Sequence, residues 1–370
     1  MLKINPVNIE LMKAIKIIIA MMLVPAVALA AGGASPGKAS KTVIPSVRYE
    51  FGGGAGHYDY APSFIVDKYG IIYGYLCQNR EPFKIVDYIY LYKGIPTPDG
   101  TVWQPGTEVI EPSRTGWDDC HICDPDVREY DIRDTNGNTH KWIMTYLGVD
   151  QWDCNHNQIG LAVADNIEGP WTKCDNLNPI IPYDRFDKWG TGQSTSIVLD
   201  DTTIAIFYHS TTTVANGGLA MRIINLSDMK KFETGEELKT PFIWANTYVA
   251  LTKDRIYAVS EQRSENYEKE IPTWVGDLCV VRYKDRSDDF VADMTAPIET
   301  WTEIGRVTPE LSHFPRNHNP GFLTDSKGWI PDENKLTVYF TTAVTGDDWL
   351  WSYDLYSATF PIKDYFKNRK

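Results

Sequence analysis

The feature that most constrains the fold of this chain is an internal repeat of β-hairpins. Five segments share one pattern: a polar or acidic start, a short β-branched run, a turn with Asp, Gly, Asn or Lys, and a second apolar strand. An apolar third strand follows each hairpin, and a more polar fourth strand follows most of them. The hairpins are DYAPSFIVDKYGIIYGYLCQN, CDPDVREYDIRDTNGNTHKWIMTYLGVD, QSTSIVLDDTTIAIFYHS, ANTYVALTKDRIYAVSEQ and HNPGFLTDSKGWIPDENKLTVYFTTA.

Four antiparallel strands repeated five times predict an all-β fold, a five-bladed β-propeller of four-stranded antiparallel blades. A β-sandwich or jelly roll also contains many short strands, and a β-helix contains repeats, although of a shorter and more uniform period. We expect the segment SVRYEFGG, which precedes the first repeat, to add a strand to the last blade. Two sheet edges would otherwise stay unpaired.

The first 31 residues have the form of an export signal. Charged residues precede the apolar run IIIAMMLVPAVALA, which ends in small residues. A membrane anchor is the alternative, but the run is shorter than the ~20 apolar residues that span a bilayer. We therefore expect residues 1–31 to be a signal peptide, 32–42 a flexible tail and 43–370 the propeller domain. Met12 is an alternative start of the same signal. The expected location is the periplasm or the outside of the cell.

The charge of the chain argues against nucleic acid as a partner. The formal net charge is −13, and loss of Lys3, Lys13, Lys16 and Glu10 with the signal peptide changes it by −2 to −15. Binding to phosphates requires a basic face. The 12 Trp and 21 Tyr are compatible with stacking on sugar rings, although aromatic residues also fill β-rich cores.

The stretch CHICDPDVRE admits two interpretations, a metal site or carboxylates at the start of a strand. Cys120 and Cys123 form a C-x-x-C pair, but no second pair lies at the spacing of a zinc site. We expect these cysteines to brace the start of the second inner strand, or to pair with each other. Asp124 and Asp126, two apart on a strand, would then point to the same side.

Polar residues recur where the hairpins should reach one face of the propeller. The innermost strand of each blade runs along the axis and the second strand returns beside it, so the start of the first and the end of the second meet on one face. A β-core needs only turn-forming residues there. The residues at these positions are His57, Asp59, Asn79, Arg80, Asp124, Asp126, Asp150, Gln193, His209, Asn246, Glu261, Arg263, Arg316, His318 and Asn319.

Three motifs resemble those of the five-bladed β-propeller glycosidases, the grouping of glycoside hydrolase families 32, 43, 62, 68 and 117 with the related family 130 phosphorylases. HYDYAPSF is similar to the first-blade motif with its aspartate, and CDPDV is similar to the Asp-Pro of the second catalytic aspartate. IGLAVADNIEGPW looks like the third-strand signature common in family 43. The resemblance covers most of the mature chain as architecture.

The resemblance implies catalytic roles for three carboxylates. Glycosidic cleavage requires a proton for the leaving oxygen and a carboxylate that activates water or attacks the sugar. By resemblance, Asp59 is the general base or nucleophile, and Asp124 is the residue that orients the acid and tunes its pKa. The third repeat has Gln193 where related families place a glutamate acid, so we expect Glu261 to be the acid. His209 or His318 is the alternative proton donor.

The other polar residues of this face are expected to bind substrate: His57, Arg80, Asp126, Gln193, His209, Asn246, Arg263, Arg316, His318 and Asn319. Structural alternatives exist, because Asp59 and Asp124 could cap turns, Glu261 could pair with Arg263, and a rim arginine is often only a solvated charge. We expect Arg80, Arg263 and Arg316 to bind a sugar hydroxyl or a carboxylated sugar. The resemblance also implies that a histidine near the axis can help to hold water-coordinated Ca²⁺.

The sequence thus favours an exported, monomeric glycoside hydrolase that acts on poly- or oligosaccharides, needs no redox cofactor, and has neither nucleic acid nor a membrane as a partner once the signal is removed. A sugar-binding propeller without catalysis is a second possibility, which the missing third-blade glutamate favours. A phosphate-dependent glycoside phosphorylase is a third, and it would need a basic pocket built from residues such as Arg80, Arg263 and Arg316.

Overall fold

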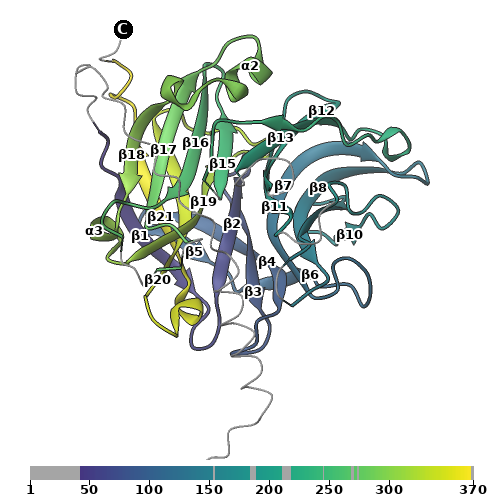
Figure 1. Cartoon of the computed structure of the whole chain (residues 1–370), viewed down its shortest axis with the longest axis horizontal. Helices are drawn as coiled ribbons and strands as arrows, with labels where there is room; N and C mark the ends of the chain where they lie inside the picture. Colours follow the sequence, from purple (N-terminus) through teal and green to yellow (C-terminus); the bar gives the residue numbers. More distant parts are fainter. Residues whose placement is uncertain are drawn as a thin grey trace, which may run out of the picture.

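The computed structural model describes residues 42–152, 155–183, 189–210, 218–244, 246–267, 271–272 and 275–367. The predicted signal peptide and all but the last residue of the predicted tail lie outside these ranges. The described chain is almost entirely β-strand, as the hairpin repeat predicts, and its strands form antiparallel sheets of four arranged side by side (Figure 1).

Three sheets contain four strands each, paired in antiparallel fashion and in chain order. The first consists of β7 (His121–Arg133), β8 (Thr139–Val149), β9 (Gln158–Ala164) and β10 (Thr172–Lys173). The second consists of β11 (Thr191–Val198), β12 (Thr203–Ser210), β13 (Leu219–Asn225) and β14 (Leu238–Lys239). The third consists of β15 (Thr247–Leu251), β16 (Arg255–Gln262), β17 (Leu278–Asp285) and β18 (Thr302–Val307).

The remaining strands form one nine-stranded sheet, in which β19 and β2 pair in parallel and join two antiparallel groups. One group consists of β2 (Asp59–Val66), β3 (Ile72–Asn79), β4 (Asp87–Thr97), β5 (Gly100–Trp103) and β6 (Thr107–Ile110). The other consists of β19 (Arg316–Thr324), β20 (Lys335–Ala343), β21 (Asp354–Pro361) and β1 (Ser46–Gly52). The β2–β6 group and the β19–β21 group with β1 would be two separate blades in a five-bladed propeller. Because they are joined in one sheet here, the number of five blades stays a prediction.

The closing strand is confirmed, because β1 pairs with β21 from Ser46 opposite Thr359 to Gly52 opposite Asp354. This pairing joins the first described strand to the last. In Figure 1 the first and last parts of the described chain accordingly lie side by side, and β2 lies beside β19. The strand covers an edge of β21 that would otherwise be open to pairing with another chain.

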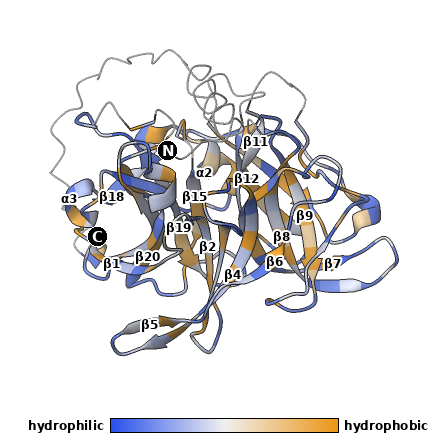
Figure 2. Ribbon diagram, turned by 90° about the horizontal axis from the view of Figure 1, so that it is seen from below, coloured by the Kyte–Doolittle hydropathy of each residue, from blue (hydrophilic) through white to orange (hydrophobic). Residues whose placement is uncertain are grey.

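The core lies between neighbouring sheets. Ile143 and Leu161 of the first sheet pack with Ile204 and Ile206 of the second in one apolar cluster. Similar clusters join the second sheet to the third, the third to the β19–β21 group, and β2–β4 to the first sheet. Each fully buried Ile, Leu or Val contributes about 1.5–3 kcal/mol relative to an exposed one. The strands are accordingly coloured as apolar in Figure 2, while most loops are polar.

Helices are short and lie outside the sheets. They are η1 (Met229–Lys231), α2 (Phe290–Thr295), η2 (Ile298–Thr300), α3 (Pro309–Ser312) and η3 (Trp349–Ser352). The side chain of Asp289 accepts a hydrogen bond from the backbone N–H of Ala292 and so caps α2. The β4–β5 hairpin extends away from the body of the molecule (Figure 2).

One backbone irregularity recurs at the start of the five inner strands β2, β7, β11, β15 and β19. A non-glycine residue there has a positive φ of 46–54°. In four of these strands the pairing with the next strand also shifts at this point, as at a β-bulge. The five residues are Ala61, Asp124, Gln193, Asn246 and Asn319. Asn and Asp tolerate this conformation better than other side chains.

Candidate functional site

The five irregular positions surround one pocket. It holds about 350 Å³ of empty space, part of it open solvent, and Ala61, Asp124, Gln193, Asn246 and Asn319 all line it together with the residues that follow them. In three strands the following residue is a proline, which has no N–H and therefore fits where the ladder of hydrogen bonds is interrupted. The inner strands thus bring four predicted site residues from distant parts of the chain into one place.

Asp124 is the carboxylate of this pocket. It is 9 % exposed, and burial raises its pKa to about 7. This value already includes a smaller upward effect of the negative charge of Asp87 and a downward effect of the Gln193 backbone N–H. Such a pKa lets one carboxyl group both accept and release a proton near neutral pH.

A disulfide between Cys77 on β3 and Cys123 on β7 holds Asp124 in place. The backbone N–H of Asp124 donates to Cys77 Sγ at 3.0 Å. The expectation that cysteines brace the start of this strand is therefore confirmed for Cys123. The alternative pairing of Cys123 with Cys120 is wrong, because β3 lies beside β7 and Cys120 is a free cysteine.

Glu261 and His318 form a buried pair next to the pocket. The distance from His318 Nδ1 to Glu261 Oε2 is 2.6 Å. The same oxygen accepts hydrogen bonds from Asn246 Nδ2 at 2.8 Å and the Asn319 backbone N–H at 3.1 Å, and Oε1 accepts one from the Gly276 N–H at 3.1 Å. This arrangement suits a carboxylate that accepts hydrogen bonds and orients His318.

Three further predicted residues lie around this pair. Burial lowers the pKa of His209 to about 4, and the charge of Glu261 partly offsets this effect. Burial also lowers the pKa of Arg263, whose guanidinium stacks on the Tyr267 ring at 4.4 Å. Arg316 is fully buried, and its guanidinium lies 4.9 Å from the Trp349 ring. The charges of Glu261 and Arg263 act on these neighbours, so the three side chains lie near the Glu261–His318 pair, and their role in binding stays a prediction.

Asp59 lies outside the residues that line the pocket. Its Oδ1 accepts hydrogen bonds from Gln78 Nε2 at 2.9 Å and from the Tyr92 hydroxyl at 3.3 Å, both on neighbouring strands. Burial raises the pKa of Asp59 to about 7, and the charge of Asp354 adds to this effect. The position in β2 that matches Asp124 is Ala61. His57, close to Asp59 in sequence, contacts the Asn79 carbonyl oxygen at 3.2 Å.

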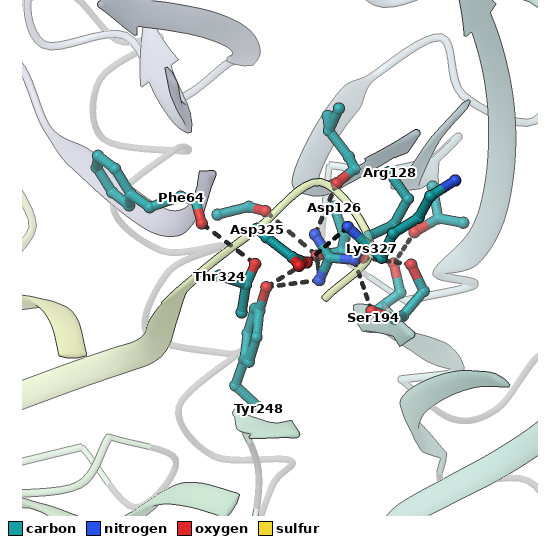
Figure 3. Close-up of polar contacts among 12 residues, drawn as sticks. Phe64, Asp126, Arg128, Ser194, Tyr248, Thr324, Asp325 and Lys327 are labelled. Carbon is teal, nitrogen blue, oxygen red and sulfur yellow. Dashed lines mark hydrogen bonds and ion pairs between the residues drawn. The ribbon is translucent and has the colours of Figure 1, made fainter. Parts of the chain in front are cut away.

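Two predicted substrate ligands are already occupied by protein groups. Arg80 pairs with Glu108 and Glu111 at the outer part of its sheet. Asp126 pairs with Arg128 at 2.8 Å and lies inside the polar network that Figure 3 shows. Of the three arginines proposed for a phosphate pocket, Arg263 lies close enough to Arg316 to lower its pKa, whereas Arg80 is paired with two glutamates.

Sequence reasoning missed Tyr353 and Trp349, which lie against His318 and Arg316. The Tyr353 ring stacks on His318 with centroids 5.3 Å apart, and Trp349 packs edge-on against Tyr353 at 5.6 Å. Both belong to the segment WLWSY between β20 and β21. The concentration of aromatic residues there was a usable signal, since it follows the end of a second strand.

Among the described residues, one group of three potential metal ligands lies close together: Cys77, Cys123 and Asp124. The two cysteines are joined in a disulfide, so the group lacks the thiolates of a zinc site. Bound Ca²⁺ stays a prediction. The Asp124 carboxylate and the Asn246 Oδ1, which has no hydrogen-bond partner in the described chain, are donors of the type that Ca²⁺ prefers.

Sequence comparisons give no relative, since no protein-family model matches the chain and no curated protein matches it. Solved structures do match. Zg3597, a family 117 glycoside hydrolase of the marine bacterium Zobellia galactanivorans, has a TM-score of 0.54 at 14 % identity, over 86 % of this chain and 90 % of that one. The family 62 α-L-arabinofuranosidase of Coprinopsis cinerea has a TM-score of 0.52 at 11 % identity, over 86 % and 97 %.

A third match is the GH43_1 enzyme of Xanthomonas citri, solved with xylotriose, with a TM-score of 0.50 at 14 % identity, over 86 % of this chain and 90 % of that one. At such identities the likeness concerns the fold. Within the described residues, no helix has the length and apolar character needed to cross a membrane. The predicted resemblance is confirmed at the level of architecture: this chain has the β-propeller fold of glycoside hydrolases from families 43, 62 and 117.

Proposed function

We propose that this protein is an exported glycoside hydrolase that cleaves poly- or oligosaccharides by acid/base catalysis. The observation that carries the proposal is Asp124, a buried carboxyl group with a pKa of about 7 in the pocket that all five inner strands share. The fold shared with glycoside hydrolases of three families supports it.

Asp124 and His318 divide the proton transfers. Asp124 in its ionised form takes a proton from the water that attacks the anomeric carbon, and His318 gives a proton to the oxygen that leaves as the glycosidic bond breaks. Glu261 contacts His318 Nδ1 and so holds the imidazole in one orientation for this transfer. His209, with its pKa of about 4, is neutral at pH 7 and is a poor donor.

These roles differ from those that the family resemblance implies. Asp59 is the base by resemblance, but Ala61 occupies the position in β2 that matches Asp124, and the Asp59 carboxylate contacts Gln78 and Tyr92. Glu261 is the acid that its place at the end of a second strand suggested, but four hydrogen-bond donors face it. We therefore assign Asp124 as the base and Glu261 as the residue that positions His318.

The test compares Asp124→Asn with Asp59→Asn, the same change at two buried carboxyl groups. Hydrolysis of a panel of aryl glycosides and of plant and algal oligosaccharides is the measurement, with circular dichroism as the control for folding. We expect Asp124→Asn to lower kcat by a factor on the order of 10²–10⁴. Asp59→Asn should change it far less. A loss of activity in Asp59→Asn alone would return the role of base to Asp59.

Two outcomes would replace hydrolysis with another function. Sugar binding without turnover by the wild-type protein would identify a binding module. Product release that depends on phosphate would identify a phosphorylase, although Arg80 is already paired with Glu108 and Glu111.

A further inference from the structure

Arg316 is a buried cation that pairs with no anion among the described residues. It is the first residue of β19 and is 0 % exposed. Its Nε and Nη1 atoms have no hydrogen-bond partner in the described chain. Burial lowers the pKa of Arg316 and the charge of a second cation, Arg263, lowers it further, while the neighbouring Tyr353 hydroxyl acts in the opposite direction. Burial without a counter-charge costs several kcal/mol, so this arrangement is unfavourable unless an anion from outside joins it.

The groups around Arg316 form one side of the candidate site. The Trp349 ring covers the guanidinium at 4.9 Å and also packs against Tyr353. The Tyr353 hydroxyl has no hydrogen-bond partner among the described residues either. Tyr353 in turn stacks on His318, the proposed proton donor. An anion between Arg316 and Tyr353 would therefore lie next to the position of the reacting sugar.

We propose that Arg316 and the Tyr353 hydroxyl bind the carboxylate of an acidic sugar, so that the substrate of this glycosidase contains a uronic acid. The inference rests on the proposed function and names its substrate class. A planar guanidinium donates two parallel N–H groups to a carboxylate, and the tyrosine hydroxyl adds a third donor. Trp349 belongs to the short η3 segment between β20 and β21, outside the strands that carry Arg316 and His318.

Binding is measured first, because it does not depend on turnover. Wild-type protein is titrated by calorimetry with glucuronic acid, galacturonic acid, glucose, galactose and inorganic phosphate, and the melting temperature is recorded with each. We expect the two uronic acids to bind and to raise the melting temperature, and the neutral sugars to do neither. Equal binding of neutral and acidic sugars would overturn the proposal. Binding of phosphate without uronic acids would also overturn it and would favour a phosphorylase.

Three variants locate the site. Arg316→Met keeps the length of the side chain and removes the charge, and should weaken uronic acid binding by about 10-fold or more. Without ligand, this variant should melt at the wild-type temperature or above, since it removes an unpaired buried charge. Arg316→Lys should bind weakly because it lacks the planar fork, and Tyr353→Phe should lose less. Uronic acid binding to Arg316→Met at wild-type strength would refute the site.

Hydrolysis separates this inference from the proposed function. If glycosides are cleaved but Arg316→Met leaves the preference between acidic and neutral substrates unchanged, the acidic-sugar inference fails and the glycosidase stands. If uronic acids bind through Arg316 but no glycoside is cleaved, the glycosidase fails and the carboxylate site stands.

Discussion

Two arginines are completely buried among the described residues, and their surroundings are opposite. Arg128 on β7 pairs with Asp126 at 2.8 Å and donates hydrogen bonds to the Tyr248 hydroxyl, the Ser196 carbonyl and its neighbour Val127, each at 2.6 Å (Figure 3). Arg316 on β19 has no such partner in the described chain and is covered by the ring of Trp349. The Arg128 guanidinium thus has its hydrogen-bond partners within the protein, whereas the Nε and Nη1 atoms of Arg316 have none in the described chain.

The difference separates a structural region from a functional one. Asp126 contacts Ser63 of β2, Ser196 of β11 and Tyr248 of β15 in addition to Arg128 of its own strand, so the complete network ties four inner strands together. Arg316 ties nothing together. A polar group that the fold does not satisfy is available for a ligand, and this is the reason to look for substrate at the end where Arg316 lies.

The largest expected effect comes from breaking the complete network. Arg128→Met should lower the free energy of unfolding by about 3–5 kcal/mol, because Asp126 would be left buried with an unpaired charge. Arg316→Met is the matched control, with the same substitution at a residue that is equally buried, and should lower stability by little or nothing. Urea denaturation of both variants is the measurement. If both variants lost the same free energy of unfolding, the proposed difference between a structural and a functional region would be wrong.

A somewhat smaller effect is expected from the disulfide beside the pocket. Replacing Cys77 and Cys123 together by Ala opens a cross-link between residues 46 apart and should cost about 2–4 kcal/mol of stability. Because Asp124 N–H donates to Cys77 Sγ, the pocket should also lose its geometry. Activity of the variant, assayed at a temperature where it is fully folded, should therefore fall. Cys120→Ala is the control, since Cys120 is a free cysteine.

The most gradual of the expected effects is the dependence of stability on pH. Asp124 has a pKa of about 7 in the folded chain and an ordinary value of 3.8 when unfolded, so the folded form binds its proton more tightly. Its contribution to stability is present below pH 3.8 and is lost as pH rises to about 7, by up to ~1.4 kcal/mol per pH unit. Activity should rise over the upper part of this range, since the base must be ionised. Asp124→Asn should flatten part of the stability profile, measured by thermal unfolding at pH 4, 5.5, 7 and 8.

The strand repeat was readable from sequence because hairpins leave local signals. Every predicted hairpin from β2–β3 to β19–β20 forms and a third strand follows each, while a fourth strand follows in the first four repeats and is β1 in the last. Alternating apolar residues and turn residues act over a few positions, so a linear reading detects them. It was harder to predict which residues occupy equivalent positions in the different inner strands. Alignment on the prolines Pro62, Pro125 and Pro320 would have matched Ala61, not Asp59, to Asp124.

The candidate site was predicted in part. Asp124, Gln193, Asn246 and Asn319 line one pocket, as their positions at strand starts predicted. The sequence did not reveal which charged groups would be paired. Arg80 and Arg316 looked alike as arginines on the same face, but one meets two glutamates and the other meets none in the described chain. Such pairings join residues far apart in the chain and depend on how the sheets are placed.

The sequence by itself determined the strands, their grouping in fours and the strand that closes the ring, because these follow from local hydrophobic periodicity and turn chemistry. Only the tertiary structure decided that Cys123 pairs with Cys77, that Glu261 contacts His318, and that Arg316 meets no counter-charge in the described part of the chain. The physical reason is distance. Hydrogen bonds and charges act over a few ångströms, and folding alone sets which side chains from different sheets come that close.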